Sequence, residues 1–426
     1  VIQKDQHSVS ITDISNNALK VVDGLRVEGH KAYIVGGAVR DLLLGGVPKD
    51  FDVATNATPE EIRSIFKFSR IIGRRFRIAH IRFDREIIEV TTFRGHHKID
   101  VANSSLADSS QHSAKGILLR DNVFGPVEED AVRRDFTINA LYYDPESSSI
   151  IDYTGGLEDL QERKIKVIGD PITRFREDPI RILRAIRFAN KIDFKMDPSI
   201  TKAIPKSSRF LSDIPPARMF DEWMKIFLAG SARANLDKLI HHSLLDYFFP
   251  NLKAIMEKEP KWTQLIKDAC SSTDLRISHR KSVTPSFLLA AMLWPQVATN
   301  TKEIVGSKGT SISAITSASS NILRKSNSVI AIPKRFSTAM REIWKIQCLL
   351  ESTRGKNPKL LIEQRWFRAS YDLLLLREAV TDCRSGLGKN WSNQQNLYKK
   401  KPKTHESNRY HSRVNNGRGL CKETKF

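Results

Sequence analysis

Two aspartates stand one residue apart in an otherwise apolar stretch near the start of the chain. Asp50 and Asp52 belong to the run VPKDFDVAT, which we interpret as a strand. Aspartate is disfavoured in strands, and residues i and i+2 of a strand project from the same face. Two carboxylates that close repel each other unless a cation lies between them. The pair therefore predicts a divalent metal site of hard oxygen ligands, although a solvated strand end explains an isolated pair more simply.

A glycine pair precedes the aspartates. Gly36 and Gly37 lie between a predicted strand, KAYIV, and a predicted helix, AVRDLLLGG. Glycine lets the backbone come close to a phosphate, and helix N-termini favour anions. Arg40 would lie in the first turn of that helix, where its guanidinium could bind a phosphate through two hydrogen bonds. A plain tight turn explains the glycines alone more simply, and the spacing fits neither the dinucleotide-binding pattern nor the P-loop.

Three further positions could complete such a site. Glu89 lies in the predicted strand IIEVTTFR, which could bring it beside the aspartates as a third metal ligand or leave it on an exposed edge. Asp135 follows Arg133 and Arg134 in RRDFTINAL, a pattern that fits a phosphate-contacting site or a surface cluster of ion pairs. Asn139 would be one helical turn beyond Asp135 and could share its face.

A row of charged residues follows in REDPIRILRAIRFANK. On a helix, Asp178 and Arg181 would be neighbours at the i, i+3 spacing, and Arg184 continues the row. A carboxylate beside a fork of N–H donors could address the hydrogen-bonding edge of a base. A solvated helix face explains the same row equally well.

The elements that would hold these residues change character near residue 160. Residues 30–160 alternate between strand and helix patterns. They include a helix over TPEEIRSIFKF with a capping box from Thr58 to Glu61, a hairpin of RIAHIRF and IIEVTTFR, and a helix over EEDAVRRDFTINALYY. Residues 1–29 predict a leader with one helix, and residues 100–116 predict a Ser-rich mobile loop. From about 160 to 385 the period is helical, with a Ser/Thr-rich surface excursion at 297–330, and residues 386–426 predict a basic, disordered tail.

The composition limits the kinds of partner that this protein is expected to bind. The 426 residues carry a net charge of +21, which favours a polyanion, either nucleic acid or an anionic membrane surface. The sequence contains no apolar run long enough to cross a bilayer and no recognisable secretory signal, so we expect a cytoplasmic protein that acts on nucleic acid. The four cysteines are scattered without a CxxC pair, which predicts ordinary thiols rather than a zinc site or disulfides.

Four segments, in their order and spacing, resemble the class II tRNA nucleotidyltransferase and poly(A) polymerase superfamily. They read VGGAVRDLLLG, KDFDVATNATPEE, RRDFTINALYYD and REDPIRILRAIRFA, and the likeness runs from about residue 30 to about 385. The segments IIGRRFRIAHI, DREIIEVTTFRGHH and LLRDNVFGPVEEDAVRRDF resemble the bacterial poly(A) polymerase branch. IAIPKRFSTAMREIWKIQ and RWFRASYDLLLLREAV are similar to the arginine-rich C-terminal domain of that branch. The loop from Gly95 to Gly116 departs from the expected pattern in its length and serine content.

The resemblance implies an α+β head, built on a polymerase-β-like nucleotidyltransferase sheet with helices, followed by an all-α neck, body and C-terminal helices. The implied boundaries are 1–29 for the leader, 30–160 for the catalytic head, 161–235 for the neck, 236–385 for the body with the arginine-rich domain, and 386–426 for the tail. It implies catalytic roles for Asp50, Asp52 and Asp135, with Glu89 as a further metal ligand. The positions implied to bind the nucleotide are Gly36, Gly37, Arg40, Arg133, Arg134, Asn139, Asp178, Arg181 and Arg184.

The activity implied is template-independent transfer of AMP from ATP to RNA 3′ ends, with release of pyrophosphate and two Mg²⁺ or Mn²⁺ ions as cofactors. The basic body and tail would bind the RNA backbone without reading sequence. Family likeness also suggests association with RNA-degradation machinery. The alternatives are a CCA-adding enzyme of the same fold and a catalytically silent RNA-binding relative, against which the intact aspartate pair argues.

Overall fold

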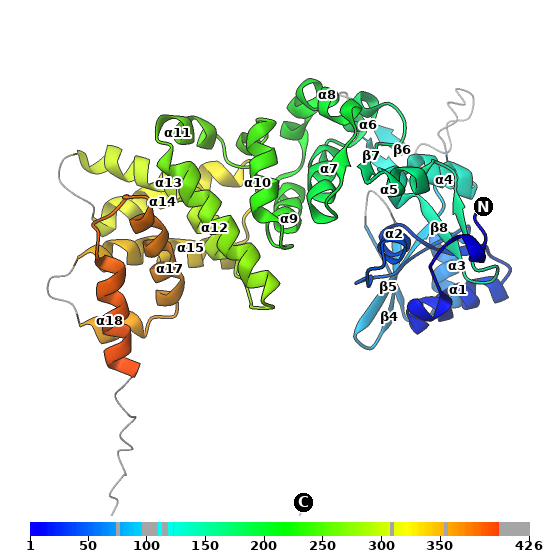
Figure 1. The fold of residues 1–426 in the computed structure, drawn as a ribbon, viewed down its shortest axis with the longest axis horizontal. Helices are drawn as coiled ribbons and strands as arrows, with labels where there is room; N and C mark the ends of the chain where they lie inside the picture. Colours follow the sequence, from blue (N-terminus) through cyan, green and yellow to red (C-terminus); the bar gives the residue numbers. More distant parts are fainter. Residues whose placement is uncertain are drawn as a thin grey trace, which may run out of the picture.

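The chain forms an elongated molecule, with a head that contains the sheet at one end and helices toward the other (Figure 1). The structure is a computed structural model, and it describes residues 1–73, 77–95, 110–112, 118–121, 123–306, 311–352 and 357–399. Three of the residues in the segment predicted to mark the poly(A) polymerase branch, Arg74, Arg75 and Phe76, lie outside the described residues.

The head is built on a seven-stranded sheet. Its strands lie in the order β3 (Ser69–Ile72), β4 (Ile78–Phe83), β5 (Glu86–Thr92), β2 (Asp52–Thr55), β1 (Ala32–Val35), β8 (Leu141–Asp144) and β9 (Ser149–Asp152). β2 and β5 run parallel, and the other neighbouring pairs are antiparallel. The predicted hairpin is confirmed as β4 and β5.

The two faces of the sheet pack against different helices. Alternate residues such as Ile34 and Val53 share a buried core with α1 (Asn16–Val27), α2 (Gly37–Leu43) and α3 (Pro59–Ile65). Their neighbours Val35 and Ala54 pack on the opposite face, against α4 (Val127–Arg133). Because side chains alternate along a strand, Asp52 projects on the α4 side with Ala54.

Two predictions about the head are wrong in detail. β2 begins at Asp52, so Asp50 precedes the strand instead of lying within it. The helix predicted over EEDAVRRDFTINALYY ends at Arg133, and a 3₁₀ turn (Thr137–Asn139) leads into strand β8. The reason is that Tyr142 and Tyr143 alternate between two buried sheet faces, where tyrosine suits a strand.

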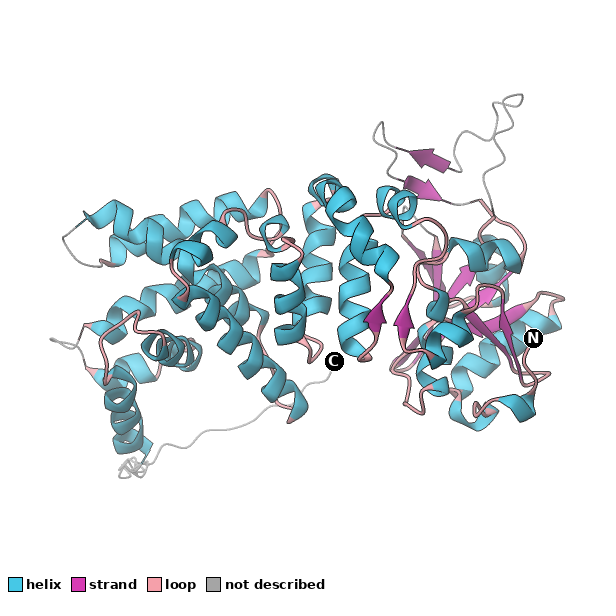
Figure 2. Cartoon of the chain, turned by 45° about the horizontal axis from the view of Figure 1, so that its top comes forward, coloured by secondary structure: helices cyan, strands magenta, loops and turns pink. Residues whose placement is uncertain are grey.

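Helices make up most of the rest of the described chain (Figure 2). They are α5 (Gly156–Gln161), α6 (Pro171–Glu177), α7 (Ile180–Lys191), α8 (Pro198–Ser207), α9 (Pro216–Phe227), α10 (Ala232–His241), α11 (Leu252–Lys258), α12 (Lys261–Ser278), α13 (Pro285–Val305), α14 (Ile312–Asn327), α15 (Lys334–Glu351), α16 (Pro358–Ile362), α17 (Phe367–Ala379) and α18 (Leu387–Lys399). Short strands β10 (Lys164–Ile165) and β11 (Lys195–Met196) pair in parallel, and further 3₁₀ turns occupy Lys4–Gln6, Ile11–Asp13, Ser208–Asp213 and Leu245–Tyr247.

Three segments predicted to lack regular structure contain it. Within the Ser/Thr-rich stretch 297–330, residues 297–305 form the end of α13 and residues 312–327 form α14, whose buried positions include Ile315, Ala318 and Ile322 at helical spacing. Residues 307–310 lie outside the described residues. The tail begins with α18, whose Leu387 and Trp391 are buried one turn apart in a small core with α15–α17. Its remaining residues, 400–426, lie outside the described residues. Most of the predicted 100–116 loop also lies outside them, but β6 (Ser110–His112) pairs with β7 (Leu118–Asp121).

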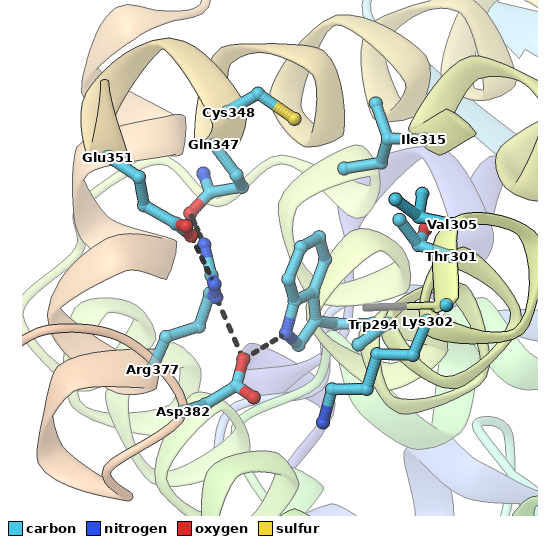
Figure 3. Close-up of a pocket in the computed structure, with 12 residues that line it drawn as sticks. Trp294, Thr301, Lys302, Val305, Ile315, Gln347, Cys348, Glu351, Arg377 and Asp382 are labelled. Atoms are coloured by element: carbon cyan, nitrogen blue, oxygen red, sulfur yellow. Dashed lines mark hydrogen bonds and ion pairs between the residues drawn. The ribbon is translucent and has the colours of Figure 1, made fainter. Parts of the chain in front are cut away.

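A buried arginine joins the C-terminal helices to the body (Figure 3). Arg377 of α17 has a side chain that is 5% exposed, and it donates to Asp382 Oδ2 at 3.0 Å and to Gln347 Oε1 at 3.0 Å. It also forms an ion pair with Glu351 at 2.5 Å. The guanidinium stacks over the ring of Trp294, 4.2 Å from its centroid, and Trp294 Nε1 donates to Asp382. α13, α15 and α17 are therefore held by one polar cluster.

Two expectations from composition can be compared with the fold. Within the residues that the structure describes, no helix combines the length and the apolar character needed to span a membrane. Among the described residues, Cys270, Cys348 and Cys383 are thiols that form no disulfide, and the first two are buried.

Candidate active site

A cavity of about 680 Å³ lies where the head meets α7 and α9. Strands β2 and β5, the β1–α2 turn and the segment after α4 supply its head side. Its lining residues are Gly36, Gly37, Arg40, Asp52, Ile78, Glu89, Arg94, Arg133, Arg134, Asp135, Asn139, Asp178, Ile180, Arg181, Arg184, Phe188, Arg218, Asp221, Glu222 and Lys225. All the candidate site residues except Asp50 are among them. Arginines outnumber acids in this lining, which suits a polyanionic ligand.

Gly36 makes the turn that opens one side of the cavity. Its φ of +76° and ψ of −128° are strained for any residue with a Cβ atom, which explains the glycine. Its backbone N–H donates to Leu141 O at 3.1 Å and so ties the turn to β8. Gly37 then begins α2. The two glycines leave the backbone open toward the cavity at the point where a phosphate was predicted.

Arg40 lies beneath this turn, with only 2% of its side chain exposed. Its Nη1 donates to Asn139 Oδ1 at 2.6 Å, and its Nε and Nη2 both donate to Asp41 Oδ1, at 2.8 and 2.6 Å. The guanidinium is therefore engaged by protein groups. In this arrangement Arg40 orients Asn139, and a direct fork onto a phosphate would require those bonds to be exchanged.

Asp52 and Glu89 form the acidic part of the cavity. They are register partners on the parallel strands β2 and β5. Burial and the neighbouring Glu89 raise the pKa of Asp52 to about 6, against a lowering by Arg134 and a smaller raising by Asp50. Glu89 Oε1 also lies 3.2 Å from His80 Nε2. Negative charge is thus concentrated around Asp52.

These carboxylates supply only some of the ligands that a divalent ion needs. Asp50 is exposed, precedes the strand and lies outside the cavity lining, although its charge still acts on Asp52. Within the described residues there is no group of three or more His, Cys, Asp or Glu side chains arranged to hold a metal ion. Mg²⁺ is often bound by one or two carboxylates together with waters and substrate phosphates. The donors present fit that type of site rather than a closed protein cage.

A buried aspartate that was not predicted from the sequence fixes the arginine beside these carboxylates. Asp130 of α4 has a side chain that is 2% exposed, and its Oδ2 accepts from Arg134 Nη2 at 2.9 Å and from Tyr142 Oη at 2.7 Å. Its Oδ1 accepts from the backbone N–H of Arg94 at 3.1 Å. Burial alone would raise the pKa of Asp130, but Arg134 and Arg94 bring it down to about 2. The only signal in the sequence was its position one helical turn before Arg134.

Asp135 is half-buried within a second cluster. Its Oδ2 accepts from Arg184 Nε at 2.7 Å, and its Oδ1 accepts from Asn139 Nδ2 at 3.2 Å. Burial would raise the pKa of Asp135, but Arg184 and Asn139 hold it below its ordinary value. Asn139 does reach Asp135 as predicted, through a 3₁₀ turn and not along an α-helix. Asp135 therefore links the head to α7.

The Asp178–Arg181 pair is not formed on one helix, which corrects the prediction. α6 ends at Glu177 and α7 begins at Ile180, because Pro179 interrupts the pattern. Asp178 Oδ2 accepts from Arg218 Nη2 of α9 at 2.7 Å. Arg181 Nη1 donates instead to Arg174 O at 2.8 Å and to Glu177 Oε2 at 3.1 Å. Both side chains still line the cavity.

Arg133 and Arg134 are held from both sides of the junction. Arg133 Nη1 donates to Gly95 O, and Arg134 is fixed by Asp130. Arg174 of α6 donates from Nη2 to the carbonyl oxygens of both residues at 2.7 Å. The two arginines predicted to contact a triphosphate therefore occupy set positions between the head and the first neck helices.

Three family models match the chain. "Poly A polymerase head domain" matches residues 32–166, "Probable RNA and SrmB-binding site of polymerase A" matches 193–256, and "Polymerase A arginine-rich C-terminus" matches 307–419. Poly(A) polymerase I of Escherichia coli O157:H7 is 45% identical over 89% of this chain and 82% of that protein. The Haemophilus influenzae protein of the same name is 43% identical over 89% and 84%. A CCA-adding enzyme of Ligilactobacillus salivarius is 33% identical over 69% of this chain and 74% of its own length.

Solved structures agree on the fold. An apo CCA-adding enzyme matches with a TM-score of 0.61 and 19% identity over 93% of this chain and 87% of that chain. The Thermotoga maritima CCA-adding enzyme, solved with tRNA, matches with a TM-score of 0.58 and 18% identity over 91% and 83%. The mixed sheet of the head, its arginine-lined cavity and the helices that follow define the nucleotidyltransferase fold class, and the predicted fold is confirmed.

Within that class, the family follows from the sequence comparisons. The chain belongs to the poly(A) polymerase family of polynucleotide adenylyltransferases. CCA-adding enzymes are weaker relatives by both identity and coverage.

Proposed function

We propose that this chain transfers AMP from ATP to RNA 3′ ends and releases pyrophosphate. The observation that carries the proposal is the cavity itself, whose lining contains both the Asp52–Glu89 pair and several arginines. An acidic pair that needs a cation, opposite groups that bind phosphate, suits phosphoryl transfer from a nucleoside triphosphate. The identity of 45% to Poly(A) polymerase I supports ATP and RNA as the substrates.

Asp52 would be the principal metal-holding residue, with Glu89 and Asp50 adding negative charge beside it. When bound there, Mg²⁺ or Mn²⁺ lowers the pKa of the attacking RNA 3′-hydroxyl and neutralises charge on the phosphates. Arg133 and Arg134, fixed in their positions as described, would hold the triphosphate so that its innermost phosphorus faces the carboxylates.

Asp178 and Arg181 would read the incoming base. Each is oriented by a neighbour, Asp178 by Arg218 and Arg181 by Glu177, so that the edge they present is preset before the nucleotide binds. An acceptor and a donor in fixed positions form hydrogen bonds with only one pattern of base atoms. With any other base, buried polar groups would be left without a hydrogen-bond partner. The protein would then serve as its own template. Asp135, which is held by Arg184 and Asn139, would keep this base-reading end aligned with the head.

RNA is the partner that the charge favours. The net charge of +21 allows contact with many phosphates without reading sequence, and such binding weakens steeply as salt is added. Association with RNA-degradation machinery remains a prediction from family likeness.

The length and composition of the product test the proposal. The purified protein is incubated with a tRNA that lacks its 3′-terminal CCA, with an unrelated RNA, and with each nucleoside triphosphate singly and together. Long tracts of A on both RNAs are expected. Addition of only C, C and A to the tRNA, followed by arrest, would favour the CCA-adding alternative. Good RNA binding without incorporation of any nucleotide would favour a silent RNA-binding relative.

A further inference from the structure

A second groove lies away from the active site, between the end of α12, the start of α13 and one side of α17. Its volume is about 520 Å³. We call it the α12–α17 groove and define it by its lining: Ser272, Thr273, Leu275, Arg276, His279, Lys281, Ser282, Val283, Thr284, Phe287, Arg365, Trp366, Arg368, Ala369, Asp372, Leu375 and Leu376. None of these residues belongs to the candidate active site.

The floor of the groove is apolar and incompletely covered. Leu275 of α12 is 58% exposed and Leu375 of α17 is 40% exposed. Beside them lie Trp366, Phe287 and Leu376, which are half-buried and pack against the main core. Single exposed leucines are ordinary, but two on neighbouring helices around one groove form a contiguous apolar surface of the kind that marks interaction sites.

The rim is strongly basic. Arg276, Lys281, Arg365 and Arg368 surround the floor, and Asp372 is the one acid in the lining. Asp372 is already in an ion pair with Arg368, at 3.1 Å. The groove therefore presents an excess of positive charge around an apolar floor.

The groove is also preformed. Arg276 Nη2 and Nε donate to Ser282 O at 2.9 and 3.2 Å, so that the turn between α12 and α13 is closed against the end of α12. The guanidinium of Arg365 lies 5.0 Å from the centre of the Trp366 ring and holds it against the floor. A preformed groove avoids much of the ordering cost of binding.

We infer that the α12–α17 groove is a docking site for an acidic, amphipathic segment of a protein partner. Apolar side chains of that segment, one helical turn apart, would cover Leu275 and Leu375, and its carboxylates would pair with the basic rim. The site adds a protein-binding function to the polymerase proposed above and does not depend on that proposal.

Two other occupants fit less well. Residues 400–426 of this chain contain eight Lys and Arg residues and two Glu residues, so the rim would repel them. Single-stranded RNA would pair with the arginines, but its bases need open aromatic faces. Trp366 is half-buried beneath Arg365, and the two leucines would remain uncovered.

Fluorescence anisotropy with three labelled probes of equal length tests the inference. The first is an acidic helical peptide with Leu at positions i, i+3, i+4 and i+7 and Glu elsewhere. The second replaces each Glu by Lys, and the third replaces each Leu by Ser. We expect binding of the first alone, with a Kd on the order of micromolar, and weaker binding at higher salt. Binding of the Lys peptide as tightly as the Glu peptide, or no binding of the Glu peptide, would overturn the inference.

Variants of single residues test whether the Glu peptide binds in the α12–α17 groove. Leu275→Ser, Leu375→Ser and Arg365→Glu should each weaken binding of the Glu peptide at least tenfold. The matched controls are Leu360→Ser, whose leucine is 65% exposed on α16, and Lys389→Glu on α18, and both should bind as the unchanged protein does. AMP transfer should be unaffected by the three leucine changes. If the groove variants bind the peptide normally but lose affinity for an oligo(A) RNA, the groove is an RNA site and the inference is wrong.

Discussion

At the scale of single residues, a buried carboxylate outside the cavity lining positions one of the cavity's arginines. Asp130 accepts hydrogen bonds from Arg134, from Tyr142 and from the backbone of Arg94. A buried carboxylate with these partners fixes the guanidinium of Arg134 in one orientation. If Arg134 binds the triphosphate as proposed, the fold fixes its orientation before ATP binds, as preorganised electrostatic stabilisation requires.

Asp130→Asn should therefore weaken ATP binding more than it slows turnover. The change removes the charge that holds Arg134, and we expect the KM for ATP to rise by about tenfold or more, with a smaller change in kcat. Steady-state AMP incorporation at varied ATP measures both. The matched control is Asp382→Asn, which also removes a buried, arginine-paired carboxylate, with a side chain that is 4% exposed, but does so far from the cavity. An equal rise in KM in both variants would show that Asp130 has only a structural role.

Asp52 should make the stability of the metal-free protein depend on pH. Its pKa is about 6 in the folded protein and 3.8 ordinarily. Because the folded-state pKa is the higher one, the stabilisation is full below about 3.8 and is lost as the pH rises to about 6. Asp52→Asn removes this dependence, so in EDTA the variant should gain up to about 2–3 kcal/mol over the unchanged protein across that range. Thermal unfolding at several pH values measures the gain, and parallel curves for the two proteins would argue against the assignment.

At the scale of elements, the corner between α6 and α7 positions the two residues proposed to read the base. Pro179 separates the helices, so Asp178 and Arg181 are held by different neighbours and converge on the cavity from two elements. The backbone N–H of Arg181 still donates to Asp178 O at 3.0 Å, which keeps the corner tight. Under the proposed function, selectivity for one base would depend on this corner as a unit.

Arg181→Ala should relax the preference for ATP. Removal of the guanidinium takes away donors that are preset toward the base, and we expect the ratio of kcat/KM for ATP to that for CTP to fall by about tenfold or more. The matched control is Arg176→Ala, one helix earlier, where the arginine is exposed and stacks on Phe210. Competition between the two nucleotides on one RNA primer gives the ratio. An unchanged ratio in Arg181→Ala would show that base reading lies elsewhere.

The same elements show what sequence could and could not predict. The β1–α2 glycine turn, the hairpin of β4 and β5 and the capping box at Thr58 were predictable because each is specified by local residues. The strand β8 was not, because LYYD continues the run EEDAVRRDFTINALYY that was predicted to be one helix, and only its pairing with β1 and β9 identifies it as a strand.

The ion pairs between distant residues of the site could not be predicted from the sequence either. Twelve of the residues that line the cavity were predicted from their types and from family resemblance, but the residues that α9 contributes, such as Arg218 and Glu222, were not. Their partners were not found, because the Asp178–Arg218 and Arg187–Glu222 ion pairs join positions 35 to 40 residues apart on different helices. Such pairs follow from helix packing, which no local pattern specifies.

At the scale of the whole molecule, one core runs from the head junction to the C-terminal helices. It includes Phe136 at the edge of the head, Trp223 in α9, Trp344 in α15 and Val380 after α17. The C-terminal helices therefore pack on the body directly, and Arg377 adds the buried polar cluster that fixes their orientation (Figure 3).

Arg377→Ala should destabilise the protein strongly. It leaves the buried Asp382 with only Lys261, at 3.6 Å, as a cation and removes the partner of Glu351, whose side chain is 31% exposed. Breaking a buried ion pair typically costs about 3 kcal/mol or more. Chemical denaturation measures the free energy of unfolding. The control is Lys359→Ala, which breaks an exposed pair with Glu363, 58% and 59% exposed, and should change stability by less than about 1 kcal/mol. Similar losses in both variants would contradict the buried cluster as the anchor of α17.

The most direct test of the whole account is AMP incorporation by Asp52→Asn. If Asp52 holds the cation that drives transfer, the rate should fall on the order of 10³-fold while RNA binding stays normal. The control is Asp84→Asn in the β4–β5 turn, whose φ of +41° asparagine tolerates and which should keep full activity. An Asp52→Asn protein that tails RNA within threefold of the normal rate would contradict the claim that this cavity performs the reaction.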